Sequence, residues 1–588
     1  MTAAISKPLA IMASQLTTGV RRVAIIGGGP TGIASAKYLL AEDIFQAIDI
    51  FEQRDNVGGI WNLSGSGNTR LIPIPQTNPR YGIASGSSVN DALEFESPLY
   101  DYLETNIPKT MMAYPHTPFS DSLPLYPKHD DVLRYLEAYA EPIRHLVRFR
   151  TQVVDVRGLD HSADISCLAQ KWRLRIKDLN TEISTEADYD AVIVANGHYT
   201  VPHVPNITGI AEWHKKYPNI IMHSKAYRRP EDFSGQKVIV VGNSASGLDI
   251  AGQLGPCVQQ PVYLSSRSSS QLAPAGSGPA WRKDVAEIEE FVFSEGDRAV
   301  RTKNGDVFGG FDAVIFATGY FYSFPFLSRK SASPASSSET HSPSGSAASF
   351  ISASSTEQQS HQSSSTPASV LLQNLTTSGL RTHDVYKHFL HINYPTLAFP
   401  LLNLKVVPFP LAENQAAVIA RLWSGRLDLP SRESMRRWER DEEERLLEAH
   451  RLRPAPDAVI GGSIASNKHN PEVAKPKYEG GFHTLVYPED AAQINTLYGW
   501  AASARPRDGL ENDGVGKLGT RWDEEQVWLR KQFPNLKSAY TQLDDRRSNV
   551  TSVEELGDEW KFGFEKWKEE TSKEEKVDIF RRAAVPGY

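Results

Sequence analysis

Two segments of the chain place a glycine-rich turn directly after a short run of apolar residues. The first run, Val23–Ile26, is followed by Gly27-Gly28-Gly29-Pro30-Thr31-Gly32, and the second, Val238–Val241, by Gly242-Asn243-Ser244-Ala245-Ser246-Gly247. A short, entirely apolar run is typical of a parallel strand that is buried on both faces. A turn of this kind leads into a helix whose first amides and dipole bind the phosphates of a dinucleotide. The chain is therefore predicted to be an α/β protein with two dinucleotide-binding, Rossmann-like domains.

The residue that follows the next strand differs between the two segments, and it predicts two different ligands. Glu52 follows the apolar strand Ala47–Phe51, where a carboxylate accepts hydrogen bonds from both hydroxyls of a ribose. Arg267 follows the strand Pro261–Leu264, where a guanidinium binds a 2′-phosphate that a carboxylate would repel. Ser244 replaces the middle glycine of the second turn with another small side chain, whose hydroxyl can bind a phosphate. The pair indicates a flavoprotein that binds FAD at the first turn and NADPH at the second.

Two similar segments, Tyr189–His198 and Phe311–Tyr320, each combine an apolar strand with a turn of small residues. They bracket the second nucleotide-binding unit, so the NADPH domain is predicted to be inserted into the FAD domain. A serine-rich stretch near residues 329–370 has few large apolar side chains and is expected to be disordered. The expected division is a flexible N terminus (1–20), the FAD domain (21–203), the NADPH domain (204–311), the second part of the FAD domain (312–480) and a helical C-terminal extension (481–588).

Composition excludes several other classes of protein. A net charge of −7 without a sustained basic stripe argues against a nucleic-acid partner. The two cysteines, Cys167 and Cys257, form no CxxC motif, so neither a dithiol relay nor a zinc or iron–sulfur site is expected. No apolar run approaches the ~18 residues of a transmembrane helix, and the N terminus lacks a signal peptide. We expect a soluble cytoplasmic protein, either free or resting on the surface of the endoplasmic reticulum.

Several motifs together resemble the flavin-containing monooxygenases of the fungal type, and are similar to the yeast thiol-oxidising branch. The resemblance spans roughly residues 20–330 and 370–540. It rests on both glycine-rich turns, the Glu52 strand, Gly58-Gly59-Ile60-Trp61, Leu103–Pro108, Met112–Pro115, Ala317–Tyr320 and Val407–Ala417. The family fingerprint F-x-G-x-x-x-H-x-x-x-(F/Y) is imperfect: His223 and Tyr227 match, whereas Tyr217 and Asn219 replace the phenylalanine and the glycine. Tyr227 in the last position favours oxygenation of a heteroatom over Baeyer–Villiger chemistry.

The resemblance implies a reaction and a set of site residues. NADPH would reduce FAD, dioxygen would add at flavin C4a, and the hydroperoxide formed would oxygenate a small molecule. Asn106 would be the catalytic residue beside flavin and nicotinamide, because a carboxamide both donates and accepts hydrogen bonds without titrating. The FAD site would comprise Gly27, Gly28, Gly29, Pro30, Thr31, Gly32, Glu52, Gly59, Ile60, Trp61, the backbone of Val153, and Gln415 at the N terminus of a late helix. The NADP site would comprise Thr105, Asn106, Tyr227, Gly242, Asn243, Ser244, Ala245, Ser246, Gly247, Arg267, Thr318 and Gly319.

The substrate is left open by the sequence. An electrophilic oxygen goes to soft nucleophiles, chiefly sulfur and nitrogen compounds. Three alternatives to such a monooxygenase remain: a Baeyer–Villiger monooxygenase acting on a ketone, an NADPH oxidase that releases hydrogen peroxide, and a sensor that binds FAD and NADP without turnover. Family analogy alone suggests a homodimer.

Overall fold

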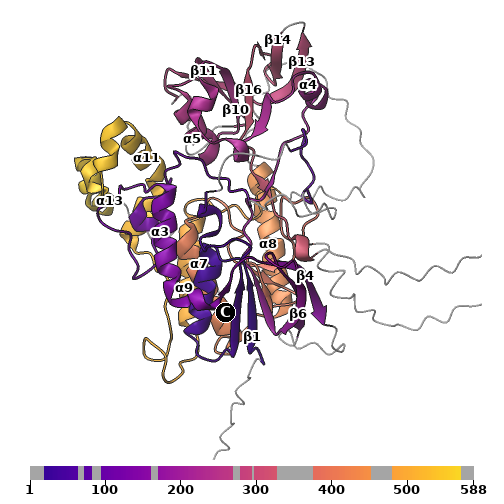
Figure 1. Ribbon diagram of the computed structural model, residues 1–588. Helices are drawn as coiled ribbons and strands as arrows, with labels where there is room; N and C mark the ends of the chain where they lie inside the picture. Colours follow the sequence, from indigo (N-terminus) through magenta and orange to yellow (C-terminus); the bar gives the residue numbers. More distant parts are fainter. Residues whose placement is uncertain are drawn as a thin grey trace, which may run out of the picture.

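The computed structural model describes residues 19–63, 72–81, 95–159, 170–268, 278–294, 297–327, 375–451 and 480–570. The expected flexible N terminus up to residue 18, the serine-rich insertion 329–370 and Cys167 lie outside these ranges. Two sheets organise the described residues, one in the lower half of Figure 1 and one in the upper half. The predicted mixed α/β architecture with two nucleotide-binding folds is confirmed.

The first sheet contains the first glycine-rich turn. Its strand order is β18-β19-β20-β7-β1-β2-β3, and β1 (Arg22–Ile26) lies between β2 (Ala47–Phe51) and β7 (Ala191–Val194) with both pairings parallel. The other strands are β3 (Val147–Arg148), β18 (Val385–Tyr386), β19 (Leu390–His391) and β20 (Leu397–Ala398). All of β1 after Arg22 is buried, as its apolar sequence predicts. The turn therefore projects from the centre of the sheet, at the carboxyl end of its parallel strands.

Alternate residues of β1 face two different layers. Val23 and Ile25 pack with helices on one face, whereas Ala24 and Ile26 pack with an antiparallel sheet on the other. The helices are α1 (Pro30–Leu40), α3 (His129–Ala140), α7 (Pro408–Trp423) and α9 (Glu489–Ala502), with α2 (Lys109–Met112) nearby. The antiparallel sheet consists of β4 (Thr151–Leu159), β5 (Lys171–Asp178) and β6 (Ser184–Tyr189). Figure 1 shows α3, α7 and α9 on one side of β1 and β4 and β6 on the other.

The second sheet contains the second glycine-rich turn. Its order is β12-β11-β10-β16-β9, with every pairing parallel. The strands are β9 (Ile221–His223), β10 (Lys237–Val241), β11 (Gln259–Ser266), β12 (Arg282–Ala286) and β16 (Ala313–Phe316). Helix α5 (Ala245–Leu254) follows β10, and α4 (Ile210–Lys216) contacts the antiparallel ribbon β13 (Ile288–Ser294), β14 (Asp297–Thr302) and β15 (Val307–Phe308).

The chain passes between the two sheets twice, and the two passages pair with each other. Strand β8 (Val201–Pro202) is antiparallel to β17 (Tyr320–Phe321), and the amide of His203 donates to the Gly319 carbonyl at 3.0 Å. The expected domain boundary at residue 312 does not agree with this pairing. Strand β16 begins at Ala313 and is hydrogen-bonded to β10, so it belongs to the second sheet and the return passage begins near Tyr320.

Both turns have the same backbone geometry. Gly27 has φ +107°, and a Cβ on Gly32 would lie 2.0 Å from the Gly27 carbonyl oxygen. Gly242 has φ +115°, and a Cβ on Gly247 would lie 1.9 Å from the Gly242 carbonyl oxygen. No side chain fits at such distances, so the last glycine of each turn is required for close packing of strand and helix.

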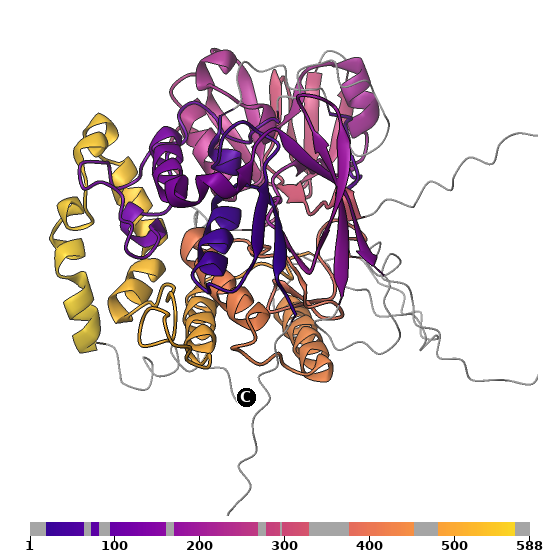
Figure 2. The ribbon, with the colours of Figure 1, turned by 60° about the horizontal axis from the view of Figure 1, so that its bottom comes forward.

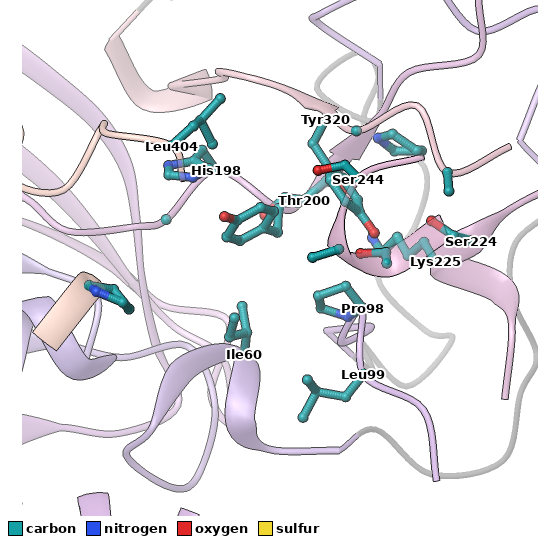
Figure 3. A pocket seen from close by; sticks show the side chains of 18 of the residues that line it. Ile60, Pro98, Leu99, His198, Thr200, Ser224, Lys225, Ser244, Tyr320 and Leu404 are labelled. Atoms are coloured by element: carbon teal, nitrogen blue, oxygen red, sulfur yellow. The ribbon is translucent and has the colours of Figure 1, made fainter. Parts of the chain in front are cut away.

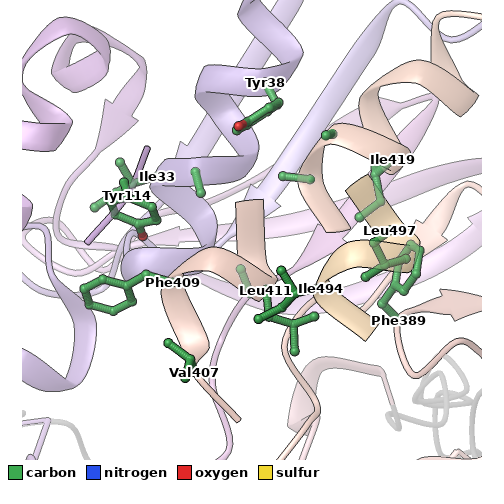
Figure 4. Packing of buried hydrophobic residues seen from close by; sticks show 14 of the residues in the cluster. Ile33, Tyr38, Tyr114, Phe389, Val407, Phe409, Leu411, Ile419, Ile494 and Leu497 are labelled. Atoms are coloured by element: carbon green, nitrogen blue, oxygen red, sulfur yellow. The ribbon is translucent and has the colours of Figure 1, made fainter. Parts of the chain in front are cut away.

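The C-terminal segment is helical but is not a separate extension. Helix α9 packs against α7, so that Ile494 and Leu497 join Leu411 and Ile419 in the core of the first sheet (Figure 4). Helices α10 (Glu524–Lys531), α11 (Phe533–Thr541), α12 (Asp558–Lys561) and α13 (Gly563–Glu570) follow, and Figure 2 shows them along one edge of the molecule. The long helix α8 (Arg432–Arg451) lies elsewhere, against β18. None of the helices in the described ranges is long and apolar enough to cross a membrane.

Glu413 is a buried acid in the core between α1 and α7. Its Oε1 accepts a hydrogen bond from the Tyr139 hydroxyl at 2.8 Å, and burial raises its pKa from 4.5 to about 8. The folded protein therefore retains a proton between pH 5 and 8 that the unfolded chain releases, so stability falls as pH rises through that window, by roughly 1.4 kcal/mol per pH unit at most. The lowered pKa of Lys37, about 8 through burial, has an opposite effect only above that pH.

Replacing Glu413 by glutamine is expected to flatten this part of the stability profile. The melting temperature of the wild-type protein should fall from pH 5 to pH 8 more steeply than that of Glu413→Gln, as measured by a fluorescence melt at each pH. Glu212→Gln, on an exposed position of α4, is the control and should follow the wild type. Parallel profiles for the wild type and Glu413→Gln would show that Glu413 is ionised in the folded state.

Candidate active site

A single cavity of about 4240 Å³ reaches both glycine-rich turns. Ordinary small-ligand sites are roughly 300–1,000 Å³, so this cavity has room for two dinucleotides and a substrate. Figure 3 shows its centre, with Ile60, Pro98 and Leu99 opposite Ser244, Lys225 and Tyr320. The residues around it come from both sheets, from the passages between them and from the C-terminal helices.

The first turn offers backbone groups and one buried carboxylate to this cavity. The Glu52 Oε2 accepts a hydrogen bond from the Gly28 amide at 2.7 Å, and its Oε1 accepts one from the Arg54 amide at 2.8 Å. Gly29 lies against Gly59, so that backbone lines the cavity where a phosphate would approach. Of the predicted FAD residues, the cavity is lined by Gly27, Gly29, Pro30, Thr31, Glu52, Gly59, Ile60, Trp61 and Val153. Gly28 and Gly32 do not line the cavity: Gly28 packs against the Glu52 side chain and Gly32 against the Gly27 carbonyl.

The second turn consists of small, uncharged residues, and a cation, Arg267, lies near it in the same cavity. Ser244 caps the N terminus of α5 without a side-chain hydrogen bond to the helix, and it is exposed to the cavity. The Arg267 side chain is 82% exposed and lies 3.8 Å from Glu287, a carboxylate that also pairs with Lys303. Of the predicted NADP residues, the cavity is lined by Thr105, Asn106, Gly242, Asn243, Ser244, Ala245, Ser246, Arg267, Thr318 and Gly319.

Asn106 lies in the same cavity, on a loop whose neighbouring backbone is fixed. The Thr105 amide donates to the Pro127 carbonyl at 2.9 Å, and the Thr105 hydroxyl donates to the Ile107 carbonyl at 3.0 Å. Thr105 and Ile107 are buried, whereas Asn106 is exposed to the cavity. The loop therefore presents one carboxamide to the cavity that both nucleotide-binding turns share.

Gly247 packs against the Gly242 carbonyl and, like Gly28 and Gly32, does not line the cavity. Of the predicted site residues with long side chains, Gln415 and Tyr227 do not line it either. Gln415 lies in the middle of α7 and is fully buried. Its Oε1 accepts a hydrogen bond from the Leu401 backbone amide at 2.7 Å, and its Nε2 donates one to Asn403 Oδ1 at 3.1 Å. The helix N terminus that reaches the cavity is formed by Val407, Pro408 and Phe409, because α7 begins at Pro408, earlier than the prediction assumed.

Tyr227 is the second residue to be corrected. Its ring is fully buried in the core of the second sheet against Tyr100 and Phe233, and its hydroxyl donates to Gln253 Oε1 at 3.1 Å. His223 of the same fingerprint links strand β9 to the second passage, with its Nε2 3.0 Å from the Gly319 carbonyl oxygen. Burial lowers the pKa of His223 to about 3, so it is neutral. The fingerprint thus holds the second sheet together and contributes no side chain to the cavity from these two positions.

Sequence reasoning missed several residues at the centre of the cavity, including His198, Thr200, Lys225, Tyr320 and Leu404 (Figure 3). His198 follows strand β7 in the small-residue turn, and burial lowers its pKa to about 4. Its neutral ring is packed near Tyr199 and Tyr322. The available signal was that His198, Lys225 and Tyr320 come within four residues of the ends of the parallel strands β7, β9 and β16, where ligands bind in α/β sheets.

Comparison with known proteins decides the family. The family model described as flavin-binding monooxygenase-like matches residues 89–277. The thiol-specific monooxygenase of Saccharomyces cerevisiae is 31% identical over 415 residues, which cover 68% of this chain and 77% of that protein. The chain belongs to the flavin-containing monooxygenase family.

Other monooxygenases of this family are similarly related. The flavin-containing monooxygenase iboF of Amanita muscaria is 27% identical over 476 residues, covering 72% of this chain and 82% of that protein. The structure of the S-allyl-L-cysteine S-oxygenase of Allium sativum has a TM-score of 0.60 and 23% identity, covering 93% of this chain and 99% of that chain, and shares the fold. The protein is a flavin monooxygenase, an enzyme that binds a flavin and acts on a small molecule with dioxygen. No cluster of metal-binding side chains is present in the part of the monooxygenase that the structure describes.

Proposed function

We propose that this enzyme uses FAD, NADPH and dioxygen to transfer one oxygen atom to a soft sulfur or nitrogen nucleophile. NADPH supplies two electrons, one oxygen atom enters the substrate, and the other leaves as water. The observation that carries the proposal is the position of Asn106 in the one cavity that both glycine-rich turns share. The names of two related proteins, a thiol-specific monooxygenase and an S-allyl-L-cysteine S-oxygenase, support sulfur as the acceptor atom.

The residues of the first turn fit FAD. Gly29 and Gly59 form a cradle that a side chain would fill, and α1 has no acidic residue in its first turn to repel a pyrophosphate. Glu52 is buried at the end of β2, where its carboxylate would accept hydrogen bonds from ribose hydroxyls. The bound flavin would supply acceptance of a hydride and activation of dioxygen, chemistry that no side chain provides.

The residues of the second turn fit NADPH. The open N terminus of α5 would bind the pyrophosphate, with the Ser244 hydroxyl adding a hydrogen bond. Arg267 would bind the 2′-phosphate in a charge-assisted contact. Asn106 would donate a hydrogen bond to the reacting oxygen and accept one from the nicotinamide amide. Apolar side chains such as Ile60, Leu99 and Leu404 would exclude water around that point.

A product assay tests the reaction class directly. The FAD-loaded enzyme is incubated with NADPH and, separately, with a thiol, a thioether, a tertiary amine and a ketone, and the products are identified by mass. Oxygenated sulfur or nitrogen compounds are expected. An ester from the ketone alone would indicate Baeyer–Villiger chemistry, and failure to oxidise NADPH with any compound would indicate a sensor.

Replacing Arg267 by alanine is expected to weaken the binding of NADPH and to leave the binding of NADH unchanged. Loss of a charged hydrogen bond costs about 1.5–3 kcal/mol, so the KM for NADPH should rise about tenfold to a hundredfold while that for NADH stays within about twofold. Steady-state flavin reduction with each cofactor is the measurement. Arg229→Ala, exposed and outside the cavity lining, is the control. Equal losses for both cofactors would show that Arg267 does not bind the 2′-phosphate.

A further inference from the structure

The C-terminal segment from α11 onward packs against the loop that carries Asn106. The Leu125 amide donates to the Val550 carbonyl at 2.8 Å, which joins the C-terminal segment to the stretch of chain before α3. The Leu125 carbonyl in turn accepts a hydrogen bond from the Lys109 amide at 2.9 Å, just after the Asn106 loop. Arg547 lies 3.2 Å from Glu104, at the start of the loop. In Figures 1 and 2 the C-terminal helices lie beside α3, on the side of the molecule that contains the loop. This segment also lines the cavity with Phe533, Asn535 and Lys537.

Lys537 of α11 contacts the peptide group that joins Thr105 to Asn106. Its Nζ donates a hydrogen bond to the Thr105 carbonyl oxygen at 3.0 Å and lies 3.5 Å from the Glu104 carboxylate. The ammonium group also lies 4.3 Å from the centre of the Tyr126 ring. Lys537 and Glu104 are largely buried, and burial lowers the pKa of Lys537 while Glu104 opposes that shift. A buried cation with a carboxylate, a carbonyl and an aromatic ring around it has little freedom to move.

We propose that Lys537 is a positioning residue that fixes the Asn106 carboxamide through the Thr105 carbonyl. The peptide group between Thr105 and Asn106 carries the carbonyl that Lys537 binds, so a rotation that turns this carbonyl away from Lys537 breaks the hydrogen bond. The Thr105 amide is held from the opposite side by Pro127. The two contacts together hold both peptide groups of Thr105, so the backbone from which the Asn106 side chain extends is fixed on its N-terminal side.

A simple structural brace would have a different consequence from a positioning residue. A brace stabilises the fold, and its loss lowers stability and activity together. A positioning residue sets the geometry of Asn106. Misplacement of a group by about 1 Å at a reacting centre is sufficient to lower the rate of the productive reaction strongly. This inference rests on the proposed role of Asn106 in directing oxygen to the substrate. The distinguishing readouts are therefore the yield of product per NADPH and the local order of the loop.

The variant that tests the proposal is Lys537→Met, which keeps the length of the side chain and removes its charge and donors. In the FAD-loaded enzyme, hydrogen peroxide released per NADPH should rise about threefold or more, with the KM for NADPH within about twofold of wild type. In the FAD-free protein, hydrogen exchange of the backbone amides in residues 103–109 should become at least about tenfold faster. Lys537→Arg, which retains a donor and a charge, should have peroxide release and amide exchange rates close to those of the wild type.

Val527→Ala is the matched control, because Val527 is buried in α10 and its truncation destabilises the C-terminal helices without touching Lys537 or Thr105. Peroxide release from Lys537→Met no greater than from Val527→Ala, or unchanged exchange at 103–109, would overturn the proposal. Should Lys537→Met not fold, Lys537→Gln replaces it with the same expected results. Unchanged peroxide release from Asn106→Ala would contradict the proposed role of Asn106 in the reaction. Wild-type hydrogen exchange at residues 103–109 in Lys537→Met would contradict only the positioning role of Lys537.

Discussion

Replacing Asn106 by alanine is expected to convert most NADPH oxidation into release of hydrogen peroxide. Asn106 is exposed to the cavity between the two nucleotide-binding turns, on a loop whose neighbouring residues are buried and hydrogen-bonded. Removal of one preorganised donor from such a site typically costs roughly 10²–10³ in rate. Product per NADPH should therefore fall by about tenfold or more, since only the oxygen-transfer step uses this donor, while NADPH is still consumed. The yields of product and peroxide from the same reaction are the measurement.

The binding of FAD separates this effect from misfolding. The Asn106 side chain is exposed to the cavity rather than buried, so Asn106→Ala should bind FAD and melt as the wild type does. Asn180→Ala, on the exposed turn between β5 and β6, is the control for a similar change elsewhere. An unchanged ratio of product to peroxide in Asn106→Ala would remove Asn106 from the reaction.

Substitution by alanine at two glycines of the first turn is expected to affect two different properties, FAD affinity at Gly29 and stability at Gly32. A Cβ on Gly29 would find the Gly59 Cα at 3.5 Å, an ordinary contact, so Gly29→Ala should fold normally. The same Cβ would occupy the space that the pyrophosphate needs, so FAD affinity should fall by about a hundredfold or more. A Cβ on Gly32 would lie 2.0 Å from the Gly27 carbonyl oxygen, so Gly32→Ala should lose ~3 kcal/mol or more of stability even without FAD.

Melting temperature of the FAD-free protein and FAD titration by flavin fluorescence distinguish the two responses. Gly29→Ala should have the melting temperature of the wild type but bind FAD much more weakly. Gly32→Ala should have a lower melting temperature than the wild type even without FAD. Normal FAD binding by Gly29→Ala would mean that the flavin pyrophosphate does not approach this turn.

The sequence was sufficient to predict the elements that repeat a local rule. The strands Val23–Ile26 and Ala47–Phe51, the two glycine-rich turns and the apolar strands before His198 and Tyr320 all have local signals, because burial on both faces demands continuous apolar runs. The family resemblance then indicated Asn106, whose loop does line the cavity. These features follow from short stretches of chain.

The errors occurred where tertiary contacts decide the position of a side chain. Gln415 and Tyr227 occupy plausible motif positions, yet packing on α7 and against Tyr100 turns them away from the cavity. The boundary at 312 was wrong because strand pairing across the second sheet, which local sequence does not encode, includes Ala313–Phe316. The contact of Lys537 with Thr105 joins residues 432 positions apart in the chain, and nothing in either local sequence predicts it.

Oxygen isotope transfer tests the central claim most directly. The FAD-loaded enzyme is mixed with NADPH and a thiol or thioether under ¹⁸O₂, and NADPH consumed, peroxide released and labelled product are counted together. The account predicts one ¹⁸O atom in the oxygenated sulfur compound for nearly every NADPH. NADPH consumption matched by hydrogen peroxide, with no label in any product of the sulfur or nitrogen compounds tested, would contradict it and identify an oxidase.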